Sequence, residues 1–254
     1  MTPSSPPRRA FAAPARPWAF VRLLGATLIL AAITTQLVLT VQNTLAATTP
    51  YGSHLPTVIA NFFSYFTILS NVSAVVALAV SAVWLLRAAA DDRAEPRGIA
   101  VLLACVSTYM IVTGIVYNIL LRNISQVGIS APWVNEVLHV VGPLILLADV
   151  ILAPRRRRLG WGALAPIAAF PILWAGYTLI RANFITGPAT GNPWWYPYPF
   201  LDPHQDGGYL TVALYIVGIA VAILAVGAGV IWAARRRGAV DAPSPDPWPE
   251  PVAV

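Results

Sequence analysis

The stretch NEVLHVVGPLILLADVIL, residues 135–152, decides the fold. Most of its side chains are apolar, yet it opens with Asn135, Glu136 and His139 and carries Asp149 near its far end. An apolar run of about 20 residues is long enough to cross a bilayer as a helix. Ionisable groups inside hydrocarbon are costly, so they need an internal partner or a function. The stretch therefore predicts a membrane helix whose polar residues turn toward the protein.

The composition of the rest of the chain agrees with this interpretation. Of the 254 residues, 57% are hydrophobic and only 10% are charged, and the mean hydropathy is +0.69. A soluble protein of this length needs more charge to cover its surface, so we expect a polytopic membrane protein. All 16 basic residues are arginine, and they cluster in short connections beside apolar runs. The pI near 9.9 therefore does not indicate a nucleic-acid partner.

Six apolar runs are long enough to span a bilayer. They cover residues 19–41, 58–86, 99–121, 133–153, 161–181 and 209–234. The alternation typical of a membrane barrel is missing, and a backbone in lipid must satisfy its own hydrogen bonds. The predicted fold class is all-α, with six transmembrane helices in the domain 19–234. The proline-rich ends, residues 1–18 and 235–254, are predicted to be disordered tails.

The arginines predict the orientation of the bundle. The two ends of the chain, the connection between the second and third runs, and the connection between the fourth and fifth runs hold 14 arginines, against 2 on the opposite side. By the positive-inside rule both termini are cytoplasmic, in a multi-pass protein of the cell membrane. The run RRRR at 155–158 is then a topology anchor, and Asp149 is expected to form an ion pair with arginines near it.

Polar residues of the second run are predicted to meet Asn135, Glu136 and His139 of the fourth run in the outer leaflet. Ser64, Thr67 and Asn71 share one face of the second run, at spacings of three and four residues. At about 1.5 Å per residue, Thr67 lies roughly 13 Å and His139 roughly 9 Å below the starts of their runs. A threonine in a membrane helix can instead bond its own i−4 carbonyl, and a histidine can simply join two helices.

Further polar and aromatic residues map to the same side of the membrane. Tyr117 and Asn118 end the third run, and Arg181 ends the fifth. The longest connection, residues 182–208, contains GNPWWYPYPFLDPHQD. Its aromatics fit an interfacial belt, and they also fit a lid that dips back over the site. The sequence leaves both interpretations open.

Common catalytic and metal-binding signatures are missing. The chain has no GxSxG, HExxH, Walker or Rossmann pattern. His54, His139 and His204 all map to the outer side, but no short ligand spacing joins them into a metal site. The sequence therefore implies no metal and no cofactor.

Three motifs in order resemble a known family. YFTILSN at 65–71, WVNEVLHVVGPLILLAD at 133–149 and PWWYPYPFLD at 193–202 are similar to the androgen-induced-gene family, which includes the androgen-dependent TFPI-regulating proteins. The chain resembles a bacterial-type member of this family, and the resemblance covers residues 55 to 235. Animal members are multi-pass membrane hydrolases of fatty acid esters of hydroxy fatty acids that use a threonine and a histidine.

The resemblance implies a lipid-ester hydrolase with Thr67 as nucleophile and His139 as base. A nucleophile of this kind also needs an orienting group for its base and donors for the oxyanion. The candidates for those roles are Asn71, Asn135, Glu136, Tyr117, Asn118 and Arg181. Candidates to line the substrate site are Trp194, Trp195, Tyr198, Phe200 and Asp202.

Two other functions stay open at this point. The alternative is a protein that binds or transports a lipid or a small apolar molecule without catalysis, and a third possibility is a metal-dependent protein built on the outer histidines. A membrane lipid is the expected substrate or ligand, no nucleic-acid partner is expected, and the oligomeric state is undetermined.

Overall fold

The computed structural model describes residues 14–88, 93–123 and 131–237. Within these ranges every regular element is a helix, and six helices are long and apolar enough to cross a membrane. The candidate spans cover Ala15–Ala46, Phe66–Arg87, Arg97–Leu121, Pro132–Leu152, Trp161–Ala182 and Gly208–Arg237. The all-α fold of the described residues is thus confirmed, and the six apolar helices support a multi-pass membrane protein.

The described residues form twelve helical elements. In chain order they are α1 (Ala15–Ala46), α2 (Leu55–Phe62), α3 (Phe66–Arg87), α4 (Arg97–Val116), η1 (Tyr117–Leu121), α5 (Pro132–Glu136), η2 (Val137–Val141), α6 (Gly142–Leu152), η3 (Trp161–Ala163), α7 (Leu164–Ala182), η4 (Pro199–Leu201) and α8 (Gly208–Arg237). All of them but α2 and η4 belong to the six candidate spans. We call the end of the bundle that holds Arg22 and Arg156 the arginine end, and the end covered by residues 183–207 the loop end.

The first and last helices extend a few residues into the regions predicted to be tails, 1–18 and 235–254. Residues 15–18 and 235–237 are helical, as the first residues of α1 and the last of α8. The remainder of the predicted tails, apart from Pro14, lies outside the described residues.

The second apolar run, predicted at 58–86, is not one continuous helix, and its candidate membrane span covers Phe66–Arg87. The chain turns between α2 and α3, where the Ser64 N–H bonds the Asn61 carbonyl at 2.9 Å. The Ser64 hydroxyl donates to the Ala60 carbonyl, a local bond that competes with a continuous helix. Thr67 therefore lies in the first turn of α3, where backbone N–H groups lack helical acceptors. Of the three residues predicted to share a helix face, Thr67 and Asn71 lie on α3, whereas Ser64 lies in the turn before it.

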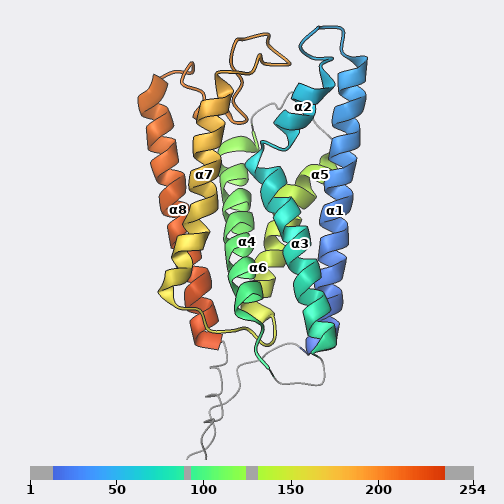
Figure 1. Cartoon of the computed structure of the whole chain (residues 1–254), viewed down its shortest axis with the longest axis vertical. Coiled ribbons are helices and arrows are strands. Elements are labelled where there is room, and N and C mark those ends of the chain that lie inside the picture. Colours follow the sequence, from blue (N-terminus) through green and yellow to red (C-terminus); the bar gives the residue numbers. More distant parts are fainter. Residues whose placement is uncertain (1–13, 89–92, 124–130, 238–254) are drawn as a thin grey trace, which may run out of the picture.

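The bundle consists of two halves that share α4 (Figure 1). One apolar core joins α1, α3 and α6 to one side of α4, and a second joins α7 and α8 to the other side. The loop end carries a smaller core, in which Tyr198 and Leu201 pack against Tyr117 and Val212. The connection 183–207 is thereby tied to the helices below it.

The predicted fourth span widens into a π-helical turn at η2. Pro143 has no N–H, so it cannot bond the carbonyl of His139 four residues earlier. The Gly142 N–H reaches back five residues to Val137. Gly114 of α4 lies beside this turn, and a Cβ there would be 3.2 Å from the His139 carbonyl oxygen. The glycine lets α4 approach η2 closely, and π turns of this kind are frequent at functional sites.

Candidate functional site

An apolar cavity of about 280 Å³ lies among α4, α7, α8 and η4. Its lining residues include four that carry a hydroxyl group, namely Thr67, Thr113, Tyr117 and Tyr198. The other lining residues are aliphatic or aromatic, and they include Phe200 and Leu201 of the loop end. A cavity of this kind can hold an apolar chain with a single polar group near its hydroxyls.

Thr67 is held in the cavity wall by Tyr198. Its N–H donates to the Tyr198 Oη at 3.1 Å, and its Oγ1 lies 3.2 Å from the same oxygen. Burial raises the pKa of the Tyr198 phenol above its usual value, although hydrogen bonds with Thr67 lower it. The phenol is therefore neutral and keeps a proton to donate. Tyr198 of the connection 183–207 therefore contacts the first turn of α3.

The Asn71 side chain bridges the backbone at Thr67 and the backbone next to His139. Its Nδ2 donates to the Thr67 carbonyl at 2.8 Å and to the Leu138 carbonyl at 3.1 Å. One amide thus links α3 to η2, beside both predicted catalytic residues. Since its two N–H groups are used here, Asn71 is a bridge between helices and has no donor left for an oxyanion.

His139 has its own set of partners. Its Nδ1 lies 3.0 Å from the Asn135 carbonyl, which can only accept, so Nδ1 carries the proton and Nε2 is the basic nitrogen. The ring stacks on Tyr117 with centroids 3.9 Å apart. The side chain of Asn135 donates to the Tyr117 hydroxyl. Among the described residues, no hydrogen bond joins His139 to Thr67, and His139 does not line the cavity.

The predicted orienting role of Glu136 is not seen. Its carboxylate binds the Arg122 guanidinium at 3.0 and 3.1 Å on an exposed surface. Asn118 is also engaged, because its Nδ2 donates to the Gly114 carbonyl and its Oδ1 accepts from Arg122. In this structure the backbone carbonyl of Asn135 orients the imidazole instead.

The loop-end candidates divide into two groups. Tyr198 and Phe200 line the cavity, whereas Trp194, Trp195 and Asp202 do not. Trp194 stacks on His204, and Trp195 packs edge-on against Tyr65. Arg181 donates to Asn61 at 2.7 Å, away from Thr67.

Asp202 forms a local bridge on the loop. Burial tends to raise its pKa, but the backbone N–H and ring of His204 bind the carboxylate and hold the pKa below its usual range. Asp202 therefore orders the connection and does not reach His139.

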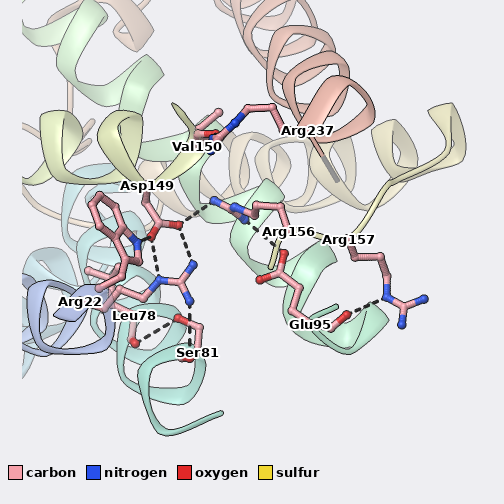
Figure 2. A network of polar contacts seen from close by, with 10 residues as sticks. Arg22, Leu78, Ser81, Glu95, Asp149, Val150, Arg156, Arg157 and Arg237 are labelled. Atoms are coloured by element: carbon pink, nitrogen blue, oxygen red, sulfur yellow. Dashed lines mark hydrogen bonds and ion pairs between the residues drawn. The ribbon is translucent and has the colours of Figure 1, made fainter. Parts of the chain in front are cut away.

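A second polar cluster closes the arginine end (Figure 2). Asp149 is 1% exposed and accepts from Arg22 at 2.7 and 3.0 Å and from Arg156 at 2.6 Å. Trp18 adds a bond to the same carboxylate at 2.7 Å. The ion pair expected for Asp149 is thus confirmed, and it joins α1, α6 and the segment after α6.

Sequence reasoning did not find the fourth charge of this cluster, Glu95. Its side chain is 1% exposed, its Oε1 lies 3.5 Å from Arg156, and its Oε2 has no hydrogen-bond partner among the described residues. Burial raises the pKa of Glu95 above its usual 4.5, and Arg156 only partly offsets this. No signal in the sequence distinguished Glu95 from the other charges of its short connection. Thr113 was missed for a similar reason, since it lies alone in an apolar run.

In the parts of the chain that the structure describes, no three His, Cys, Asp or Glu side chains come together as metal ligands would. His54 contacts Thr57 and His204 contacts Asp202, so the outer histidines lie in separate places. A scan against protein-family models and searches of curated proteins and of solved structures found no match for this chain.

Proposed function

We propose that this protein is an integral membrane hydrolase of lipid esters, of the type formed by fatty acids and hydroxy fatty acids, with Thr67 as its nucleophile. The observation that carries the proposal is that Thr67, whose hydroxyl contacts the Tyr198 phenol, lines an apolar cavity. The resemblance of YFTILSN and WVNEVLHVVGP to the androgen-induced-gene family points to the same residue. A lipid ester has the apolar chain and the single carbonyl that such a cavity suits.

In the proposed reaction, Thr67 Oγ1 attacks the ester carbonyl carbon and its proton passes to His139 Nε2. The tetrahedral intermediate collapses, the C–O bond to the alcohol breaks, and the imidazolium returns the proton to the leaving alkoxide. Water then attacks the acyl-threonine while His139 takes its proton. Collapse of this second intermediate releases the fatty acid, and the imidazolium returns the proton to Thr67 Oγ1.

Two features of the structure support these roles. The proton of His139 is on Nδ1, so Nε2 is basic, and the Asn135 carbonyl fixes this tautomer as an orienting group should. The neutral phenol of Tyr198 is 3.2 Å from Thr67 Oγ1 and is our candidate oxyanion donor. Proton transfer requires Nε2 to come within about 3 Å of Oγ1, directly or through one water.

The test is ester turnover by the purified full chain in phospholipid vesicles. Thr67→Ala should abolish release of the hydroxy fatty acid, and Thr67→Ser should retain part of it. Ser73→Ala is the matched control, because Ser73 is on the same helix and donates to its own i−4 carbonyl outside the cavity. Thr113→Ala removes the other threonine hydroxyl of the cavity and should also leave turnover in place. Loss of turnover in Thr113→Ala, with turnover retained in Thr67→Ala, would show that Thr67 is not the nucleophile.

A second candidate function is lipid binding or transport without catalysis. It is favoured by one observation: the Thr67 hydroxyl contacts Tyr198, and His139 does not line the cavity. A binding protein needs the cavity and no base. It would hold a labelled lipid as well after Thr67→Ala or His139→Ala as before, and would release no product.

A further inference from the structure

Side chains of η4 and of packed helices border the cavity beside Thr67. At the loop end, Phe200 and Leu201 of η4 form part of its lining. Toward the arginine end α7 and α8 converge, since a Cβ on Gly227 would be only 3.1 Å from the Ile167 side chain. Behind the cavity, α4 supplies Val112 and Val116. Along the axis of the bundle, the cavity is thus bordered by packed segments.

The side between α7 and α8 is different. Ile172 of α7 is 68% exposed and Leu224 of α8 is 45% exposed, and both line the cavity. A side chain that lines a cavity and is also exposed lies at its rim. Both residues belong to candidate membrane spans, and the two helices run side by side at one edge of the bundle (Figure 1). The rim between α7 and α8 therefore faces the lipid chains.

The lining of the cavity extends along α8. On α8 its lining runs from Ile216 to Leu224, which is about 12 Å at about 1.5 Å per residue. The Thr67 hydroxyl and the Tyr198 phenol lie near the end that η4 covers. An acyl chain that occupied the apolar part would leave its ester group at the two hydroxyls.

We propose that the gap between α7 and α8 is a lateral portal through which the acyl chain of a bilayer lipid enters the cavity. The hydrolysis of that lipid rests on the proposed function, whereas the entry and binding of the chain do not. The portal selects molecules that already reside in the membrane, with a flexible apolar chain as the recognised group. The aromatic connection above is then a cover for the site and not its entrance.

Small residues at the rim allow a direct test. Ala220 of α8 lines the cavity and is exposed, so Ala220→Trp should fill the portal. Leu224→Trp is a second variant at the same rim. Val221→Trp is the matched control, because Val221 is the next residue, is 61% exposed and does not line the cavity.

The experiment is photolabelling of the full chain in phosphatidylcholine vesicles with a fatty acid that carries a diazirine near the middle of its chain. We expect adducts on lining residues such as Ile219 and Ile223. Labelling should fall about tenfold in Ala220→Trp or Leu224→Trp and stay unchanged in Val221→Trp, with equal thermal melting as the check on folding.

The outcomes separate the two proposals. Equal labelling of the natural chain and a folded rim variant, or adducts confined to the connection 183–207, would overturn the portal. Labelling that depends on the rim, together with ester turnover that survives Thr67→Ala, would uphold the portal and refute Thr67 as nucleophile.

Discussion

Two carboxylates of one predicted span are paired in opposite surroundings. Glu136 meets Arg122 where both side chains are more than a third exposed, whereas Asp149 meets Arg22 and Arg156 in the interior. The ion pair of Asp149 could be predicted because a lone charge in a membrane span is costly and arginines follow it closely in sequence. The partner of Glu136 could not, because an exposed charge has many acceptable neighbours.

Removing Asp149 should destabilise the protein strongly. Asp149→Ala leaves two buried guanidinium groups without their shared carboxylate, a change that costs about 3–5 kcal/mol. Glu136→Ala is the control, and removal of its solvent-exposed pair should change the stability little. Unfolding in detergent, followed by circular dichroism, measures both. Equal losses for the two variants would contradict the role of the buried cluster.

Glu95 should make stability depend on pH. Because burial raises its pKa above 4.5, the folded chain holds the proton more tightly than the unfolded chain does. Below about pH 4.5 both states are protonated; as the pH rises above this value the unfolded state ionises first and stability is lost. Glu95→Gln cannot ionise, so its melting temperature should increasingly exceed that of the natural chain as the pH rises above about 4.5. A difference that shrinks with rising pH would refute this assignment.

The hydropathy pattern was sufficient to locate the membrane spans but not to find the breaks and turns within them. Six apolar runs located six spans, because hydrophobic length alone decides what can cross a bilayer. The break at Ser64 was missed, since hydropathy does not change where α2 gives way to α3. The π turn at η2 follows from Pro143 and from the asparagine amide that reaches the Leu138 carbonyl. Only the second of these causes requires a tertiary contact.

Close packing at the π turn should make Gly114 intolerant of a side chain. In Gly114→Ala the new Cβ would lie 3.0 Å from the Pro143 Cβ and 3.2 Å from the His139 carbonyl oxygen. We expect α4 and η2 to move apart, at a cost of about 1–3 kcal/mol. Gly218→Ala is the control: its Cβ would meet nothing within 4 Å, and helix propensity favours alanine by up to about 1 kcal/mol. Detergent unfolding of the two variants should give changes of opposite sign.

The bundle as a unit is held by charge at one end and by aromatic packing at the other. Arg22, Asp149 and Arg156 tie the arginine end, and Tyr198 ties the loop end to α3. The motif residues Thr67 and His139 were expected to meet directly. Asn71 links the backbone next to both of them, but the side chains have different partners, which periodicity along single helices could not reveal.

The orientation of the bundle is our prediction from the arginines, with the arginine end cytoplasmic. It can be measured in a Cys105→Ser background, which removes the single native cysteine. A cysteine at exposed Ser53 or Ala189 of the loop end should react with an impermeant maleimide in intact cells. One at exposed Arg158 should react only after permeabilisation. The reverse pattern would place the Thr67 site in the cytoplasmic leaflet.

Covalent labelling of Thr67 tests the central claim most directly. The purified chain is treated with an alkyl fluorophosphonate in vesicles and its peptides are analysed by mass spectrometry. We predict one adduct, on the Thr67 hydroxyl, that is lost in both Thr67→Ala and His139→Ala while Ser73→Ala retains it. His139→Ala should lose the adduct because the hydroxyl then lacks its base. An unlabelled Thr67 in a preparation that still hydrolyses the lipid ester would contradict the account.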